Sequence, residues 1–577
     1  MPPAGDAIRQ YSACLPDRPK GKPLKRRATM EKNLSRRGFI GLGCLGATAA
    51  AAGLAGCASQ TPKKDGSSEA LAETSETATA SETLIPNAGA LEFNQPTGSE
   101  VAYIEEPISE DEVVETLTCD VVVCGAGMSG VAAAASASEN GLRTILLEKG
   151  QTFAARGTEI GAFGDRIHQE AGNVLDPVAF MEDGMATAHF RCDRNVWKRW
   201  CDRSGEALNW ALDVVGDACG TFTAKAGNSL FAGVTTWGSG VRVEKGIASF
   251  VENVLAAAQA NGTDVRFSTP AVQLITQDGK VTGVYAQGEE GIIKIEAAQG
   301  VVLATGGYEF NWDLLTQRIR PRDLAVYAWI NPTITNTGDG LLMGLAAGAA
   351  EDDWPHILMN DPAGAKTGNR ANGAMLAFLR VNENGERFVN ENLSFEYMSN
   401  AIMYQPGAHD FVLLSGTDIL TSLEKAKGGA PWTPEDMYDS IKDVLVEADT
   451  LEELAEKCGI NAENLARTVA RYNELCAAGE DADYGKKPSD LIPLESGPYY
   501  AIEESGCCLV TVNGLRTDAD SRVLDHNGKA IEGLYALGNT SGSMFNGTYP
   551  HHMSAVSHGR CLTFGYLVGR RLAGLED

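Results

Sequence analysis

The chain lacks the cysteine patterns that mark several classes of redox and metal-binding protein. Its 13 cysteines form no CxxC, no CxxCH and no clustered quartet, and Cys507-Cys508 is the only close pair. Because covalent haem attachment needs CxxCH, this spacing excludes a covalently bound haem. We expect most of the cysteines to be buried thiols.

Basic residues are also scarce. The sequence has 48 Lys and Arg against 76 Asp and Glu, and ten of the basic residues precede Cys57. Without that segment, 38 basic residues face 73 acidic ones, which gives a net charge of −35. Such a surface repels nucleic acid and anionic lipid headgroups. We therefore expect no nucleic-acid partner.

The N-terminal region has a short Gly/Ala-rich stretch in place of a long apolar run. Residues Ser35–Cys57 begin with the pair Arg36-Arg37 and end in "LAGC". The arginine pair resembles a twin-arginine export signal, and "LAGC" resembles a lipobox in which Cys57 is lipidated. We predict a signal over 1–57 and a lipid-anchored protein on the extracytoplasmic face of the cell membrane. A transmembrane anchor is the alternative, and Met30 is an alternative start.

Residues 58–112 are rich in Ser, Thr, Glu and Ala and poor in aromatics in their first part. Such a composition cannot bury a core, so a disordered linker is predicted. The remaining chain, about 470 residues, is long enough for two domains.

A dinucleotide-binding pattern follows the linker. The apolar run in "VVVCGAGMSG" is typical of a buried parallel strand, and it leads into Gly125, Gly127 and Gly130 in GxGxxG spacing. An Ala-rich helix and a second strand, Thr144–Leu147, come next, and Glu148 ends that strand. The glycines allow a tight turn and close approach of a pyrophosphate, and the acid would accept hydrogen bonds from ribose hydroxyls. The pattern predicts an adenine dinucleotide.

Three later segments favour FAD over NAD. They are an apolar strand ending in glycines, Gly300–Tyr308, an acid between two glycines, Asp339, and a strand-to-glycine turn, Gly533–Asn539. With these motifs in order, the chain resembles the FAD-dependent fumarate reductase / 3-ketosteroid dehydrogenase superfamily over roughly Cys119–Gly574. A purely NAD-dependent enzyme is the alternative.

The resemblance implies an α/β fold. It has a Rossmann-like FAD-binding domain of the two-dinucleotide-binding-domain type over 113–355 and 500–577, with an inserted α+β cap over 356–499. It also implies that the helix beginning near Ser554-Ala555 directs its N-terminus at the flavin, where the helix dipole would stabilise reduced, anionic flavin. The residues expected to bind FAD are Gly125, Gly127, Met128, Ser129, Gly130, Glu148, Lys149, Arg156, Gly157, Gly161, Ala162, Val272, Gly306, Asp339, Asn539, Ser554 and Ala555.

The cap carries the first departure from the family pattern. Its segment Gly385–Glu391, "GERFVNE", resembles the opening of the mobile cap that closes over substrate. Dicarboxylate reductases of the family have a proton-donating arginine four residues after this glutamate, where this chain has Phe395. Tyr397 is then the candidate proton donor, because a phenol is protonated at neutral pH. An ordinary packed aromatic is the alternative.

A second departure lies near the C-terminus. Fumarate reductases place a carboxylate-binding arginine where this chain has Tyr549, and its absence argues against a dicarboxylate substrate. The stretch is more similar to the 3-ketosteroid dehydrogenases, in which this tyrosine hydrogen-bonds the ketone oxygen and stabilises an enolate. Met553 replaces a glycine there, which narrows the space for a flat steroid.

Three of the eight histidines fall between Asn546 and Arg560. His551 and His552 would point about 100° apart on a helix and have no ligands at metal spacing, so no metal is expected. For both histidines, a structural role and a contact with substrate or flavin remain as interpretations. His558 and Arg560 fall a turn further along, and we expect them to be structural. The candidate catalytic residues are Tyr549, Tyr397, His551 and His552. The candidate substrate-binding residues are Phe395, Met553 and Asp361, the last standing roughly where fumarate reductases keep a substrate-binding histidine.

These features predict an FAD-dependent reductase of the C=C bond of an α,β-unsaturated carbonyl compound, an enone or acrylate-like acid. Hydride would come from flavin N5 and the proton from a tyrosine. Because an exported protein has no access to NADPH, electrons would come from a separate membrane or periplasmic donor, a quinol dehydrogenase or cytochrome, in anaerobic respiration. A 3-ketosteroid dehydrogenase working in the oxidative direction and a non-catalytic flavin-binding lipoprotein are the alternatives, and the cap disfavours the second.

Overall fold

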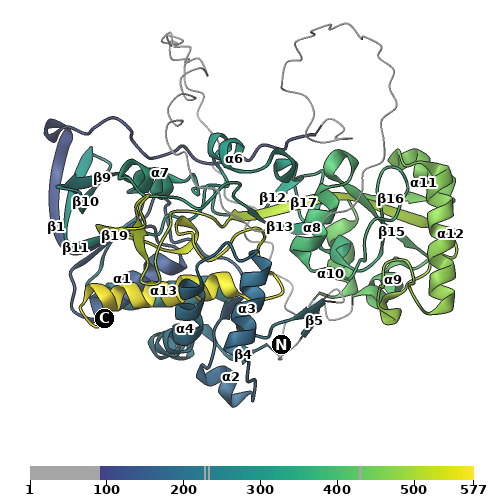
Figure 1. Ribbon diagram of the computed structural model, residues 1–577, viewed down its shortest axis with the longest axis horizontal. Coiled ribbons are helices and arrows are strands. Elements are labelled where there is room, and N and C mark those ends of the chain that lie inside the picture. Colours follow the sequence, from purple (N-terminus) through teal and green to yellow (C-terminus); the bar gives the residue numbers. More distant parts are fainter. Residues whose placement is uncertain (1–90, 226–228, 232–233, 428–431, 577) are drawn as a thin grey trace, which may run out of the picture. The chain divides into compact units, whose positions relative to one another are not determined.

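A computed structural model of the protein describes residues 91–576 except 226–228, 232–233 and 428–431 (Figure 1). The predicted export signal, the lipidated Cys57 and the first part of the predicted linker lie outside the described residues, so they stay predictions. Within the described part, no helix has both the length and the apolar composition needed to cross a bilayer.

The largest sheet forms the centre of the FAD-binding part. Strand β1 lies parallel to β2 and β11, and β19 adds to β11 in parallel. The strands predicted at 121–123 and 144–147 are confirmed, and so is the return of the C-terminal region to the first sheet. In order, this path is β18 (Arg522–Leu524), β19 (Ala530–Ala536), β11 (Ile292–Leu303), β1 (Val113–Cys124), β2 (Thr144–Leu147) and β8 (Asp264–Arg266). The antiparallel strands β9 (Ala271–Gln277) and β10 (Lys280–Gln287) extend from β11.

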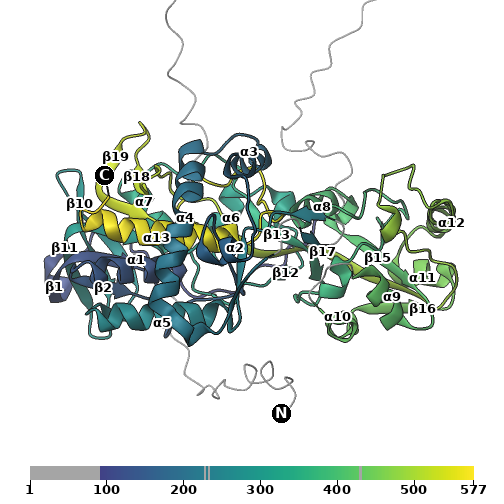
Figure 2. The same cartoon turned by 90° about the horizontal axis from the view of Figure 1, so that it is seen from below.

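Small residues bring the first and last helices of this part together. Helices α1 and α13 lie side by side against one face of the sheet (Figure 2). A Cβ on Gly565 would lie 2.5 Å from Ser129 O, and one on Gly569 would lie 2.6 Å from Ser136 Cβ. This close packing fixes the start of α13 beside the glycine loop. The helices of this part are α1 (Met128–Glu139), α2 (Arg166–Glu170), α3 (Pro177–Thr187), α4 (Arg194–Val215), α5 (Gly246–Ala260), α6 (Trp312–Arg318), α7 (Asp339–Ala346) and α13 (Val556–Leu572).

Two small sheets border the same part of the protein. The first has the order β3-β7-β4, and the second pairs β5 with β6. Their bounds are β3 (Glu159–Gly161), β4 (Phe222–Ala224), β5 (Ser229–Phe231), β6 (Val234–Thr236) and β7 (Gly240–Val243).

The cap is built around one long strand, β17. It begins at the boundary predicted for the cap, and its first half pairs with β15 and β16, so the cap shares this strand with the residues beyond 499. The strands of this sheet are β12 (Ala328–Trp329), β13 (Leu358–Ala365), β14 (Leu379–Val381), β15 (Asp410–Ser415), β16 (Leu445–Ala448) and β17 (Tyr499–Thr511). The helices are α8 (Phe395–Met403), α9 (Ile419–Ala426), α10 (Pro434–Ile441), α11 (Leu451–Cys458) and α12 (Ala462–Ala478).

Residues 91–112 were predicted to belong to the disordered linker, but they are fixed to the FAD-binding part. The backbone N–H groups of Ala102 and Tyr103 donate to Asp339, at 2.7 and 3.2 Å. The Ile104 N–H donates to Val272 O at 3.0 Å. The apolar side chain of Ile104 also packs on a small buried cluster, which the composition of the preceding residues did not indicate.

Candidate flavin site and cap interface

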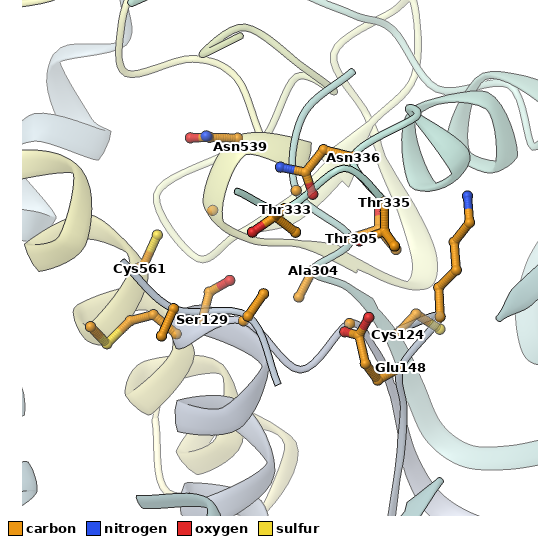
Figure 3. A pocket seen from close by; sticks show the side chains of 18 of the residues that line it. Cys124, Ser129, Glu148, Ala304, Thr305, Thr333, Thr335, Asn336, Asn539 and Cys561 are labelled. Carbon is orange, nitrogen blue, oxygen red and sulfur yellow. The ribbon is translucent and has the colours of Figure 1, made fainter. Parts of the chain in front are cut away.

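A cavity lies where the carboxyl ends of β1 and β2 meet the starts of α1 and α13. Its empty volume is about 1010 Å³, open solvent included. Figure 3 shows Glu148, Ser129 and Asn539 reaching it from different elements. The predicted FAD-binding residues that line it are Gly125, Gly127, Met128, Ser129, Glu148, Lys149, Arg156, Gly306, Asp339 and Asn539.

The three glycines of the GxGxxG loop have different roles. Gly125 has φ +111°, and a Cβ there would lie 2.3 Å from Ala304 O. A Cβ on Gly130 would lie 1.9 Å from Gly125 O, so Gly130 allows the helix to pack on the loop and does not line the cavity. Gly127 is the N-cap of α1 and has no capping side chain, and a Cβ there would meet only Ala154 O, at 4.0 Å. The first N–H groups of α1 are therefore available to an anion, which suits the pyrophosphate of FAD.

Glu148 is held at the end of β2 in the position that a ribose requires. Its Oε2 accepts from the Ala126 N–H at 2.7 Å, and its Oε1 accepts from the Gly150 N–H at 2.6 Å. Each carboxylate oxygen keeps a further acceptor position for a ribose hydroxyl. The cavity therefore fits FAD at both its pyrophosphate and its ribose.

Asp339 lines the cavity, but both oxygens of its carboxylate already accept hydrogen bonds from groups of the protein. Its Oδ2 lies 3.0 Å from Lys149 Nζ and 3.1 Å from Thr337 Oγ1. Its Oδ1 accepts the two N–H groups of the N-terminal segment at residues 102 and 103. Asp339 and Lys149 thus join this segment to the cavity wall.

The remaining predicted FAD-binding residues support the wall and are absent from the lining. Gly161 N–H donates to Ala555 O at 3.0 Å, and Ala555 is the N-cap of α13 with φ +58°. A Cβ on Gly157 would lie 2.9 Å from His558 Cε1. The predicted residues outside the lining are Gly130, Gly157, Gly161, Ala162, Val272, Ser554 and Ala555.

The first turns of α13 contribute cavity residues that the sequence analysis did not select. Ser557, His558 and Cys561 line the cavity. The His558 Nδ1–H donates to Glu159 O at 2.9 Å, and burial together with Arg156 lowers the pKa of His558 to about 4. His558 is therefore a neutral imidazole at the cavity wall, although it was expected to be purely structural.

The two adjacent histidines lie in a group of carboxylates that we call the histidine–carboxylate cluster: His551, His552, Asp183, Asp361 and Glu396. His551 Nε2 lies 3.0 Å from Asp361 Oδ1, and its Nδ1 lies 3.2 Å from Glu396 Oε2. Both contacts are ion pairs. His552 Nε2 is hydrogen-bonded to Asp183 Oδ2 at 3.0 Å, and its Nδ1 lies 3.6 Å from Glu396 Oε1.

The charges of this cluster stabilise one another, and Arg370 pairs with its third carboxylate at Asp361. Although burial opposes it, Asp361 and Glu396 raise the pKa of His551 to about 9. Asp183 and Glu396 likewise raise the pKa of His552 to about 9 against burial. Burial alone would raise the pKa of Glu396, but the two histidines outweigh it and lower this pKa to about 2. Both imidazoles are therefore protonated at neutral pH.

Each candidate catalytic tyrosine packs against one of the two histidines: Tyr549 against His551, and Tyr397 against His552. The ring centroid of Tyr549 lies 4.9 Å from that of His551, and its hydroxyl oxygen accepts the Ser557 N–H at 3.2 Å. The ring of Tyr397 stacks on His552 at 6.4 Å and is 40% exposed. Burial raises the pKa of Tyr549 well above its ordinary value and raises that of Tyr397 as well.

The candidate substrate-binding residues lie around the same cluster. The Phe395 ring lies 5.7 Å from that of His551, and Asp361 is 2.7 Å from Arg370 Nη2. Met553 is buried and forms a backbone bridge with Trp237. The structure therefore brings all seven candidate catalytic and substrate-binding residues together. No group of three or more His, Cys, Asp or Glu with a metal-site arrangement occurs among the residues described.

Two carboxylates of the cluster were not selected from the sequence. Glu396 precedes Tyr397, and Tyr397 was preferred as the proton donor because a phenol is protonated at neutral pH. Asp183 lies in α3, 369 residues before His552 in the sequence, so no local pattern connects the two.

Comparisons with known proteins agree with this site. The family model described as "FAD binding domain" matches residues 120–555. The chain is 28% identical to a vinyl phenol reductase of Lactiplantibacillus plantarum, covering 78% of this chain and 94% of the relative. It is 30% identical to a cytochrome fumarate reductase of Shewanella frigidimarina, covering 79% of this chain and 77% of the relative.

A solved structure shares the fold. It is the 3-ketosteroid Δ1-dehydrogenase of Sterolibacterium denitrificans, with a TM-score of 0.65, 20% identity, and coverage of 79% of this chain and 99% of that one. Together with the family match and the fit of the cavity, these likenesses identify the cofactor as FAD. The chain belongs to the FAD-dependent fumarate reductase / 3-ketosteroid dehydrogenase superfamily, and it is an FAD-dependent oxidoreductase acting on CH–CH or C=C bonds.

Proposed function

We propose that this protein reduces the C=C bond of an α,β-unsaturated carbonyl compound, with Tyr549 binding the carbonyl oxygen and Tyr397 giving the proton. Bound FAD supplies the hydride. The observation that carries the proposal is that two neutral phenols lie beside the histidine–carboxylate cluster, whose charges are matched once Arg370 is included.

The charge pattern supports a substrate with a neutral carbonyl over a dicarboxylate. Arg370 is bound to Asp361, and the two imidazolium groups are bound to three carboxylates. Within the described cluster, no cation is left to pair with a second substrate carboxylate. Burying an unpaired carboxylate is unfavourable, whereas a ketone or the single carboxyl group of an acrylate needs fewer partners.

Tyr549 has the properties of a group that polarises a carbonyl. Its raised pKa keeps the phenol protonated throughout the physiological range, so it can donate a hydrogen bond. The Ser557 N–H at the start of α13 orients its oxygen without using its own hydrogen. A donor of this kind stabilises the negative charge that develops on a conjugated carbonyl oxygen as hydride adds to the β-carbon.

Tyr397 has the properties of a proton donor that solvent can reprotonate after each turnover. It belongs to α8 of the cap, is partly exposed, and stacks on the protonated His552. Closure of the cap over substrate would bring this phenol to the α-carbon, which must gain a proton as the enolate collapses. The tyrosinate would then recover a proton from water or the neighbouring imidazolium.

We propose a separate quinol dehydrogenase or cytochrome at the membrane as the electron donor. The support is a relative named a cytochrome fumarate reductase, together with the predicted export signal and lipid anchor. The same site could also serve a second candidate function, oxidation of a saturated ketone, because Tyr549 would hold the ketone oxygen equally well in that direction.

The test is anaerobic reoxidation of the chemically reduced holoenzyme. An enone or cinnamate-like acid should reoxidise the flavin much faster than fumarate, and Tyr549→Phe should slow that reoxidation on the order of 100-fold. Tyr404→Phe, an exposed tyrosine just after α8, is the matched control. Fumarate reacting as fast as the enone would contradict the proposal. The second candidate function, oxidation of a saturated ketone, would be established by two results together. A saturated ketone would reduce the oxidised flavin, and enones would not reoxidise the reduced enzyme.

A further inference from the structure

Arg560 is a buried guanidinium with no acidic partner among the residues described. It is 1% exposed, its Nη2 donates to Asn539 Oδ1 at 2.7 Å, and its Cζ lies 4.6 Å from the ring centroid of Phe545. Its Nε and Nη1 have no hydrogen-bond partner in the described structure. Arg380 is equally buried but is bound by Asp410 and Glu504. An isolated buried charge is strongly unfavourable, so Arg560 requires an anion that is not part of the protein.

No carboxylate forms an ion pair with Arg560 among the residues described. Cys561 and Tyr549 are the titratable groups that affect it most, but burial raises the pKa of both, so both are neutral at neutral pH. Asp352 acts on it through space only, and its own carboxylate is bound by Asn513 and the Ser543 N–H.

Arg560 is linked to the flavin cavity through Asn539. It lies in the second turn of α13 and is not itself a lining residue, but its neighbour Cys561 and its hydrogen-bond partner Asn539 both line the cavity, as Figure 3 shows. Because a guanidinium can only donate, Asn539 must present its carbonyl oxygen to Arg560. The amide NH₂ of Asn539 is then the donor that remains for the cofactor.

We propose that Arg560 provides the counter-charge for the negative charge that FAD gains on reduction. Uptake of two electrons and one proton converts FAD to FADH⁻, so the ring system acquires one negative charge. A fixed cation near this charge stabilises the reduced form over the oxidised form and raises the midpoint potential. The role adds to that of the helix dipole and holds for any substrate of the enzyme.

The experiment compares Arg560→Gln and Arg560→Lys in the holoenzyme, with dithionite as the two-electron reductant. In Arg560→Gln, the preference for reduced over oxidised FAD should fall about tenfold, which is a drop of about 30 mV in the two-electron midpoint potential. The affinity of the apoprotein for oxidised FAD should stay within a few-fold of wild type. Arg560→Lys should have a midpoint potential close to that of wild type. Arg467 is an exposed arginine of α12, and Arg467→Gln should leave the midpoint potential unchanged.

Three outcomes would overturn the proposal. Equal weakening of oxidised and reduced FAD, with an unchanged potential, would mean that Arg560 pairs with the pyrophosphate. An unchanged potential and unchanged FAD affinity would leave it a structural residue. A change confined to the KM of a carboxylated substrate would make it a substrate-binding residue. If Arg560→Gln does not fold, Arg560→Met retains the contact with Phe545 and should show the same drop in potential.

Discussion

At the scale of single residues, the sequence pointed to side chains that the structure brings together, but not to their partners. Tyr549 and Phe395 were visible because each replaces an arginine within a family motif. The pKa values of His551 and His552 could not be predicted, because Asp183 and Asp361 reach them from distant elements. Arg560 was expected to be structural, since a sequence does not show that an arginine lacks a carboxylate partner.

The shared carboxylate, Glu396, should control the pH dependence of stability. The histidine pKa values are raised from 6.5 to about 9, so their stabilisation is complete below about pH 6.5 and is lost as pH rises through 9. The raised pKa of one histidine corresponds to on the order of 3 kcal/mol. Glu396→Gln should therefore lower the melting temperature at pH 6.5, and the decrease relative to wild type should be much smaller at pH 10. Thermal scans across this range should show no such pattern for Glu452→Gln, an exposed residue of α11. An equal loss at both pH values would refute this role.

At the scale of elements, the Rossmann-like unit was predictable, but the sharing of β17 between the cap and the FAD-binding part was not. Buried parallel strands have continuous apolar runs, and glycine spacing marks the loop between β1 and α1. By contrast, β17 serves both parts of the protein, and nothing in its sequence marks a boundary. The ordered segment at 91–112 follows a low-complexity stretch, and its few apolar contacts were too sparse to be noticed.

The glycine loop gives a prediction that separates folding from cofactor binding. Gly130→Ala places a Cβ 1.9 Å from Gly125 O, so it should destabilise the apoprotein by on the order of 1–3 kcal/mol. Gly127→Ala has space within the protein but intrudes on the anion site. It should leave apoprotein stability within about 1 kcal/mol and weaken FAD binding at least about tenfold. Calorimetry and fluorescence titration measure the two effects. Similar behaviour of the two variants would show that the loop does not divide these roles.

At the scale of the whole molecule, the cluster joins the cap to the FAD-binding part. Asp361 and Glu396 come from β13 and α8, whereas the histidines precede α13. The cap is therefore joined to the FAD-binding part by ion pairs that persist only while the histidines are protonated. The overall fold could be foreseen from the family pattern, but this connection between its parts could not.

Cap mobility should consequently rise at alkaline pH. Hydrogen exchange in α8, corrected for the intrinsic effect of pH, should increase between pH 7 and pH 10, because the histidine pKa values lie near 9. Helix α12, which is remote from the cluster in sequence and contacts α11, serves as the internal control. Unchanged exchange in α8 would mean that the cluster does not hold the cap.

The most direct measurement is stopped-flow reoxidation of the dithionite-reduced holoenzyme under anaerobic conditions, with an enone and with fumarate at equal concentration. We predict rapid reoxidation by the enone, little by fumarate, and a loss on the order of 100-fold for the enone in Tyr549→Phe. Reoxidation by fumarate at the rate of the enone, or a Tyr549→Phe variant as fast as wild type, would contradict the assignment of this site to conjugated carbonyl substrates.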